Sequence, residues 1–218
     1  PNAKRLAEAR GQQRYYVRGT FTAYNADFSK DVLALAQAGF EQISIEPVVA
    51  EPGCEWALTQ EHMPEVLAEY ERLAQAYLKE RKEGKGFNFF HFMVDLPGGP
   101  CLRKRLTGCG AGNEYVAVTP EGDIYPCHQF VGREGFRMGS VLDDTFDRTI
   151  QARFAASHVL SKPACRACWA RFFCSGGCAA NAHQMNGSID QPYDLACQMQ
   201  KKRLECALAI YAIERGDD

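Results

Sequence analysis

The spacing of the cysteines constrains this chain of 218 residues more than any other feature. The sequence contains ten cysteines, and nine of them lie after residue 100. One run has the pattern C-x2-C-x5-C-x3-C and is formed by Cys165, Cys168, Cys174 and Cys178. Upstream, Cys109, Gly122 and Cys127 form the pattern C-x12-G-x4-C, and Cys197 stands alone downstream. Thiolates two or three residues apart on a turn can bind one metal centre, as in zinc ribbons and ferredoxins.

A disulfide framework is the alternative use of so many cysteines. Disulfide-dense domains are typically small and secreted. This chain is long enough to bury a hydrophobic core, and its first residues, PNAKRLAEAR, lack the basic-then-apolar pattern of a signal peptide. In a reducing compartment, clustered thiols more often bind metals or take part in catalysis. The sequence therefore favours metal sites over disulfides.

The composition argues against two classes of partner. Lys and Arg number 25 against 27 Asp and Glu, which gives a formal net charge of -2. No basic stripe of the kind that binds nucleic acid is present. No apolar run approaches the ~18–20 residues that cross a bilayer. We therefore expect a cytoplasmic protein with neither a nucleic-acid partner nor a membrane partner.

The first hundred residues alternate the patterns of strands and helices. β-Branched and aromatic runs predict strands, and apolar residues at helical spacing predict helices. The strands are predicted at residues 15–22, 42–49 and 87–96, and the helices at residues 25–38 and 59–81. Asn25 or Asp27 is the expected N-cap of the first helix. This order implies parallel strands with right-handed crossovers, so we predict residues 1–97 to be half of a partial (β/α) barrel.

The character of the sequence changes at Pro97-Gly98-Gly99-Pro100. Helical periodicity gives way to glycines, cysteines and short elements. The patterns predict a hairpin of residues 114–118 and 123–125 around Pro120-Glu121-Gly122, and helices at residues 145–157 and 197–214. The last helix has its predicted buried face at Leu204, Leu208, Ile210 and Tyr211. We therefore expect residues 98–218 to form a second, small and irregular α+β domain.

The cysteine pattern of residues 98–218 resembles the SPASM domain of radical-SAM peptide-modifying enzymes. The signature of that family is C-x9–15-G-x4-C, then C-x2-C-x5-C-x3-C, then a last cysteine, and every element occurs here in order. Within the superfamily, the segment GGPCLRKRLTGCGAGNEYVAVTPEGDIYPCHQFVG is most similar to the maturases of six-cysteine (SCIFF) peptides. The phrases GTFT, ISIEPVV and PCHQFVG fit the same family. The resemblance also implies that a partial barrel precedes such a domain in the chain.

The resemblance implies two auxiliary [4Fe–4S] clusters. Carried over by position, auxiliary cluster I has the ligands Cys109, Cys127 and Cys178. Auxiliary cluster II has the ligands Cys165, Cys168, Cys174 and Cys197. Two alternatives stay open for the fourth ligand of cluster I: Cys101 completes the cluster, or an open iron takes a substrate thiolate. The implied role of the clusters is to bind that thiolate or to accept an electron.

The implied activity is the installation of thioether crosslinks between a cysteine sulfur and a backbone carbon of a peptide. The expected partners are a ribosomally made cysteine-rich precursor peptide and an electron donor such as ferredoxin or flavodoxin. Enzymes of this family cleave SAM at a further [4Fe–4S] cluster on C-x3-C-x2-C, and that triplet does not occur in these 218 residues. We therefore expect SAM and the third cluster only in a full-length enzyme, and no activity from this stretch alone.

Two functions other than thioether formation stay open as alternatives. Another radical-SAM task, such as sulfatase maturation or quinone-cofactor assembly, uses the same domain. Anaerobic sulfatase maturases, however, have an aspartate directly after the cysteine equivalent to Cys127, where this sequence has His128. A zinc-binding structural or interaction module would use the same thiolates for two structural Zn²⁺ ions.

Four further residues have two interpretations each, and a fifth has one. Cys54 follows a predicted strand, so it lies either at the mouth of a barrel or in a surface loop. Arg18 and Glu46 contact SAM or peptide, or they are structural polar residues of the strands. His128 hydrogen-bonds a cluster, or it is an ordinary surface histidine. Cys206 lies in an apolar helix and is expected in the core.

Overall fold

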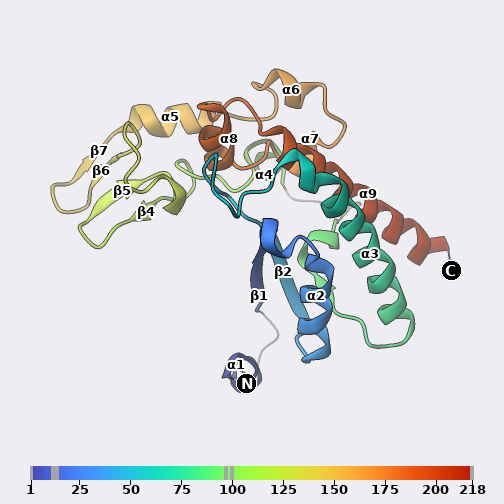
Figure 1. The fold of residues 1–218 in the computed structure, drawn as a ribbon. Helices are drawn as coiled ribbons and strands as arrows, with labels where there is room; N and C mark the ends of the chain where they lie inside the picture. The colour runs from blue at the N-terminus through green and yellow to red at the C-terminus, as the bar shows by residue number, and fades with distance from the viewer. Residues whose placement is uncertain (1, 11–14, 96–97, 99–100, 217–218) are drawn as a thin grey trace. The chain divides into compact units, whose positions relative to one another are not determined.

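The structure, a computed structural model, describes residues 2–10, 15–95, 98 and 101–216 (Figure 1). The chain forms two compact units, residues 1–97 with 198–218 and residues 98–197. Residues 198–216 thus pack with the first unit, whereas the sequence predicts them in the second domain. Leu96, Pro97, Gly99 and Pro100, on which the predicted third strand ends and the predicted break falls, lie outside the described residues.

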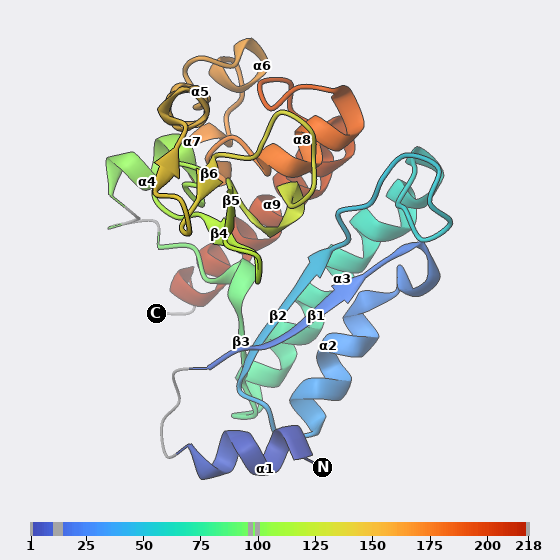
Figure 2. The ribbon, with the colours of Figure 1, turned by 90° about the vertical axis from the view of Figure 1, so that its left-hand side faces the viewer.

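The first unit contains a parallel sheet with the strand order β1-β2-β3. Its strands are β1 (Val17–Phe21), β2 (Gln42–Pro47) and β3 (Asn88–Phe89). In the register, Val17 pairs with Ile43, and Gln42 pairs with Asn88. Helices α2 (Phe28–Gln37) and α3 (Met63–Lys82) connect successive strands and lie on the same side of the sheet (Figure 2). The predicted alternation of parallel strands and helices is confirmed.

The two faces of this sheet differ in chemistry because side chains alternate along a strand. Phe21 of β1 is fully buried and stacks on Phe28 of α2, with ring centroids 4.4 Å apart. Ile43 and Ile45 of β2 are buried as well. Burial of each such side chain contributes about 1.5–3 kcal/mol to folding. The intervening positions of β1 and β2 are polar, so the second face of the sheet is polar.

The third strand is much shorter than predicted. Residues 87–96 are predicted as one strand, but β3 ends at Phe89 and the chain enters a 3-10 helix, η3 (Phe90–Phe92). Tertiary packing explains the difference, because Phe92 turns inward against Tyr77 and Phe89, at ring distances of 5.7 and 5.0 Å. An apolar run alone does not distinguish such a turn from a strand.

The helices of the first unit begin later than predicted. The N-cap of α2 is Asp27, which is one of the two residues predicted for this position. The 3-10 helix η1 (Ala23–Asn25) precedes it. The 3-10 helix η2 (Gln60–His62) precedes α3. Helix α1 (Asn2–Ala9) was absent from the prediction.

The second unit contains a four-stranded antiparallel sheet of very short strands. The strands are β4 (Ala117–Val118), β5 (Asp123–Tyr125), β6 (Gly139–Ser140) and β7 (Thr145–Phe146). The predicted hairpin is therefore confirmed as β4 and β5. Gly122 has φ +87° in its turn, and a Cβ there would lie 2.8 Å from Leu142. The turn therefore requires the glycine of the C-x12-G-x4-C pattern.

Helices of one or two turns make up most of the rest of this unit. They are α4 (Leu102–Thr107), η4 (His128–Phe130), α5 (Arg148–Ala156), α6 (Pro163–Arg166), α7 (Arg171–Cys174) and α8 (Ala179–Asn186). Helix α5 starts later than predicted, because Asp147 caps it by accepting the Thr149 N–H at 2.7 Å. The hydrophobic core of the unit is formed by Tyr125, Cys127, Phe130, Phe136, Phe154, Ala180 and Ile189.

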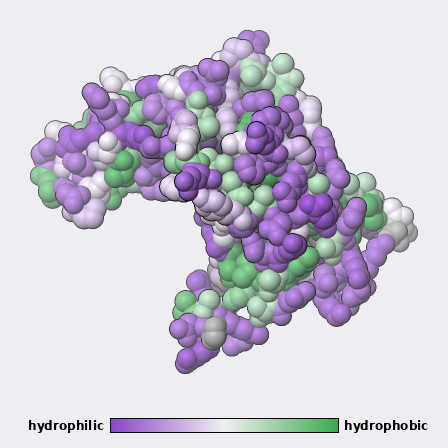
Figure 3. All heavy atoms as spheres, in the orientation of Figure 1, coloured by the Kyte–Doolittle hydropathy of each residue, from purple (hydrophilic) through white to green (hydrophobic). Residues whose placement is uncertain are grey.

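Helix α9 (Asp194–Gly216) begins before Gln198 and continues into the first unit. Leu204 and Ile210 are buried as predicted, but Leu208 is 38% exposed. Cys206 is buried in the core, as expected. Within the described residues, no helix is both long and apolar enough to cross a membrane. Hydrophilic side chains accordingly cover most of the face in Figure 3.

Candidate metal centres

The second unit brings Cys109, Cys127 and Cys178 together. Each of the three thiols interacts electrostatically with the other two, and all three act on the phenol of Tyr115. The Tyr115 hydroxyl donates to the Cys109 sulfur at 3.9 Å. Burial, followed by the neighbouring thiols, raises the pKa of Tyr115 above its ordinary value. We call these three cysteines the first thiol group.

Local hydrogen bonds and core packing assemble the first thiol group. The Gly112 N–H donates to the Pro126 carbonyl at 2.9 Å, which fixes the turn after Cys109 beside the segment before Cys127. Helix α8, which follows Cys178, packs on the same core. There the His183 ring lies 4.7 Å from the Phe136 ring.

Two of these cysteines lie at the start of a helix. Cys127 is the N-cap residue of η4, and the backbone N–H groups of Gln129 and Phe130 act to lower the pKa of its thiol. Cys178 is the N-cap of α8, where the Asn181 and Ala180 N–H groups do the same. Burial raises the pKa of both thiols, and these donors act against it. The amino end of a helix favours a negative charge, so both positions fit a metal-bound thiolate.

A second thiol group consists of Cys165, Cys168 and Cys174. Burial raises the pKa of Cys165, Lys162 lowers it, and the thiols of Cys174 and Cys168 raise it further. The Cys168 N–H donates to the Cys165 carbonyl at 3.0 Å, which closes the C-x2-C turn. Arg171 Nη1 lies 3.2 Å from the Cys168 carbonyl oxygen and braces the same turn.

The segment between Cys174 and Cys178 separates the two thiol groups. Its three residues, Ser175, Gly176 and Gly177, have φ values of +59°, +88° and +74°. Residues other than glycine rarely adopt this left-handed region, so two glycines reduce the cost of the turn. The C-x3-C spacing therefore places consecutive cysteines in different groups, not in one.

The remaining two predicted ligands, Cys101 and Cys197, belong to neither thiol group. Cys101 is exposed and is the N-cap residue of α4. Cys197 lies in the first turn of α9. Their assignment to cluster I and cluster II rests on the resemblance of the sequence.

The thiol groups do not form a mononuclear metal site. Across residues 2–10, 15–95, 98 and 101–216, no three His, Cys, Asp or Glu side chains gather as ligands of one ion. A [4Fe–4S] cluster requires its thiolates to lie farther apart, because each thiolate binds a different iron. The ligands of one Zn²⁺ ion instead meet at ~2.3 Å from the same point.

The structure places the other candidate residues away from a common site. Cys54 lies in the loop after β2, where its N–H donates to the Glu51 carbonyl at 3.3 Å. His128 is exposed and lies beside Gln129. Arg18 and Glu46 lie on the polar face of the first sheet and form an ion pair at 3.9 Å.

Glu46 belongs to a polar network that the sequence does not reveal. Arg203 of α9 bonds to Nδ1 of His91, and Nε2 of His91 lies 3.1 Å from Glu46. A neutral ring protonated at Nε2 satisfies both contacts. Burial and then Arg203 lower the pKa of His91 against the opposing effect of Glu46, which favours that neutral ring. Burial raises the pKa of Glu46, but His91, Arg203 and Arg18 together lower it.

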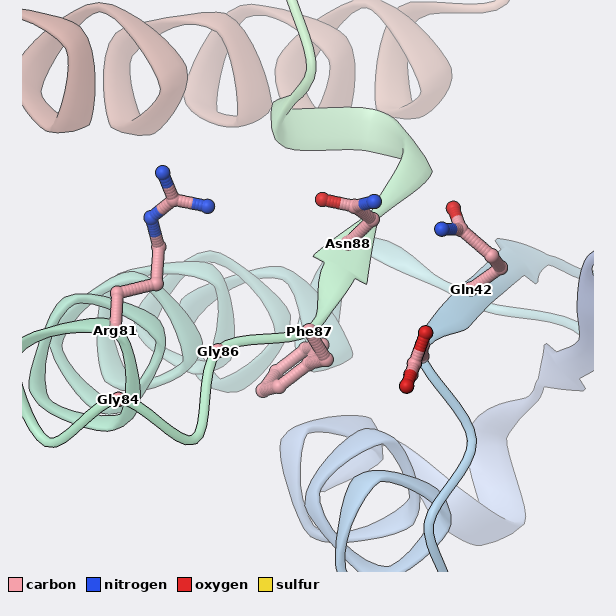
Figure 4. Close-up of a pocket in the computed structure, with 7 residues that line it drawn as sticks. Gln42, Arg81, Gly84, Gly86, Phe87 and Asn88 are labelled. Carbon is pink, nitrogen blue, oxygen red and sulfur yellow. The ribbon is translucent and has the colours of Figure 1, made fainter. Parts of the chain in front are cut away.

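A cavity of about 310 Å³ lies beside the amino ends of β2 and β3 (Figure 4). Figure 4 shows the amides of Gln42 and Asn88 on neighbouring strands, with Arg81 across from them. Arg81 is already bound to Glu214. Parallel α/β sheets bind ligands outside the opposite, carboxyl ends of their strands, so this cavity is not assigned a catalytic role.

One segment that contains four of the cysteines matches a known domain family. Residues 109–169 match the family model of SPASM, an iron–sulfur cluster-binding domain. The match includes Cys109 and Cys127 of the first thiol group and Cys165 and Cys168 of the second.

Two curated proteins are similar in sequence. An uncharacterized protein of Archaeoglobus fulgidus is 30% identical over 136 residues, which cover 60% of this chain and 32% of that protein. The mycofactocin maturase MftC of Mycolicibacterium smegmatis is 31% identical over 111 residues, which cover 49% of this chain and 28% of MftC. The chain thus spans about a third of the length of the curated relatives it matches.

The fold is similar to that of solved structures of anSMEcpe. The TM-score is 0.72 at 17% identity for anSMEcpe with bound AdoMet, over 99% of this chain and 58% of that chain. The TM-score is also 0.72 at 17% identity for anSMEcpe with bound AdoMet and the Cp18Cys peptide. This match covers 100% of this chain and 62% of that chain. The chain therefore has a mixed α/β fold similar to that of anSMEcpe, and its residues 109–169 match the SPASM iron–sulfur cluster-binding domain.

Proposed function

We propose that this chain is the C-terminal part of a radical-SAM maturase that installs thioether crosslinks in a ribosomally made cysteine-rich peptide. Residues 1–97 are the second half of its partial (β/α) barrel, and residues 98–218 hold two auxiliary [4Fe–4S] clusters. The observation that supports this most directly is the division of six cysteines into two separate thiol groups. Four of these cysteines lie within the matched SPASM segment.

The residues present fit two clusters. Cluster I takes the first thiol group with Cys101 or an open iron, and cluster II takes the second thiol group with Cys197. When bound, the clusters supply a site for a substrate thiolate or for an electron. The N–H groups at η4 and α8 stabilise the bound thiolates of Cys127 and Cys178. Because ligands from distant segments share a cluster, metal binding also contributes to the folding of this irregular unit.

Crosslink formation must balance in atoms and electrons. The peptide loses one hydrogen atom from carbon, which a SAM-derived radical takes, and one proton from the cysteine thiol. One electron is left over when the carbon–sulfur bond forms, and an acceptor such as an auxiliary cluster has to take it. The likeness to anSMEcpe establishes the fold alone, and His128 after Cys127 favours the thioether activity over sulfatase maturation.

The full-length enzyme tests this proposal. Incubated with SAM, a low-potential electron donor and a cysteine-rich peptide encoded beside its gene, it should remove two hydrogen atoms per crosslink and block one thiol for each. Mass spectrometry with thiol alkylation measures both changes. Modification of a sulfatase-derived peptide with the cysteine-rich peptide left intact would contradict the proposal and favour sulfatase maturation.

A further inference from the structure

The strongest unexplained feature of the second unit is a buried lysine. Lys162 is only 3% exposed and forms the N-cap of α6, the helix that contains Cys165. Its amine lies 3.4 Å from the Gly176 carbonyl oxygen. Gly176 is two residues from Cys174 on one side and two residues from Cys178 on the other. The amine is therefore placed at the turn that separates the two thiol groups.

The burial of Lys162 raises the question of which group balances its charge. In the part of the chain that the structure describes, Lys162 makes no ion pair with Asp or Glu, and its amine is bonded to a neutral carbonyl. Lysine is almost never fully buried unless it is paired. Moving an unpaired ammonium out of water costs several kcal/mol, so a buried lysine requires an anion nearby.

Thiols of both groups lie within the electrostatic reach of this amine. Lys162 acts on Cys165, a member of the second thiol group, and on Cys178, a member of the first. In both cases burial raises the pKa of the thiol and Lys162 opposes that shift. One buried cation thus favours the thiolate in two different groups.

We propose that Lys162 is a buried counter-cation shared by the two auxiliary clusters, and that it raises the reduction potential of both. This inference rests on the proposed presence of the clusters. A [4Fe–4S] cluster held by thiolates is anionic and becomes more so when it takes one electron. A fixed positive charge stabilises the reduced form more than the oxidised form, and net charge is one of the determinants of cluster potential. Lys162 is a positioning residue in this role, since it touches no substrate.

Reduction potentials distinguish this role from simple support of the turn. Lys162→Met removes the charge and the N–H donor, Lys162→Gln removes the charge but keeps an N–H donor, and Lys162→Arg keeps the charge. The matched control is Lys30→Met in the first unit. The Lys30 side chain is 77% exposed and paired with Asp27 at 2.9 Å. Anaerobically purified protein would be titrated with reductant and followed by electron paramagnetic resonance.

The expected result is a shift of both cluster potentials to more negative values in the Met and Gln variants. The Arg variant and the Lys30 control should shift less. Unchanged potentials in clusters that are present, or a shift of one cluster alone, would overturn the inference. If the Met and Gln variants lose iron, retention of both clusters by the Arg variant supports it, and equal loss in all three variants contradicts it. Absence of clusters from the unmodified protein would instead refute the proposed function.

Discussion

The hydroxyl of Tyr115 donates a hydrogen bond to the sulfur of Cys109 across 3.9 Å. The preceding residue, Glu114, is bound by Arg103 of α4 at 3.0 Å and by Lys104. These ion pairs fix α4, which ends just before Cys109, against the turn that presents Tyr115. Hydrogen bonds to the sulfurs of a cluster help to set its reduction potential.

Tyr115→Phe should therefore make the potential of cluster I more negative and leave cluster II unchanged. The lost hydrogen bond stabilises negative charge on the Cys109 sulfur, which is larger in the reduced cluster. The measurement is an anaerobic redox titration with spectroscopic detection of both clusters. The matched control is Tyr24→Phe, because the Tyr24 hydroxyl bonds to Glu55 at 3.0 Å in the first unit. Equal shifts of both clusters, or none, would count against this role.

Single cysteine substitutions should remove one cluster each. Cys168→Ala should abolish cluster II, and Cys127→Ala should abolish cluster I, each with loss of about half of the iron, because the two groups share no ligand. Iron analysis and spectroscopy of the reduced protein measure the loss. Cys206→Ala is the control, since Cys206 is a buried core residue whose thiol pKa burial raises to about 11. An iron content unaffected by either ligand substitution would show that the ligand assignment is wrong.

These 218 residues should not cleave SAM. They lack the C-x3-C-x2-C triplet that places an iron for SAM binding. Reduced protein given SAM should yield no 5′-deoxyadenosine above background in a chromatographic assay. A full-length enzyme from the same gene should yield it, and faster with a cysteine-rich peptide present. Robust cleavage by the 218 residues alone would reveal a SAM site elsewhere in them.

The polar network of Glu46, His91 and Arg203 should make the folded protein less stable in mild acid. The pKa of His91 in the folded protein is lowered below 6.5, so below about pH 6.5 the unfolded chain binds the proton first and folding is disfavoured. The pKa of Glu46 is also lowered, and its contribution to the stability of the folded protein is lost only at still lower pH. The charged groups facing His91 are Glu46, Arg203 and Arg18.

The test compares unfolding between pH 7.5 and pH 5.5. His91→Gln should cost about 1–3 kcal/mol at pH 7.5, because it disturbs a buried hydrogen-bonded group. It should also flatten the loss of stability over this pH range relative to the unmodified protein. An identical pH dependence in both proteins would exclude His91 as its source.

Local sequence patterns predicted much of the fold. β1 alternates in burial, and the turn at Gly122 has a positive φ that glycine tolerates, so both are visible in the sequence. The end of β3 at Phe89 depends on packing of Phe92 against Tyr77 of α3, which no local pattern encodes. The pairing of His91 with Arg203 spans 112 residues and was missed for the same reason.

The candidate site shows the same limit. The spacing of the cysteines indicates metal binding, because thiolates close in sequence are close in space. Lys162 looks like an ordinary surface lysine in the sequence, and only its burial beside the Gly176 carbonyl marks it. The contribution of Tyr115 likewise depends on a tertiary contact with Cys109.

The most direct test of the account is the metal and sulfide content of the anaerobically purified protein. Two [4Fe–4S] clusters predict about eight irons and about eight inorganic sulfides per chain, with a brown colour and broad absorbance near ~400 nm. Stoichiometric zinc in a colourless protein without inorganic sulfide would contradict the account and establish the zinc-binding alternative.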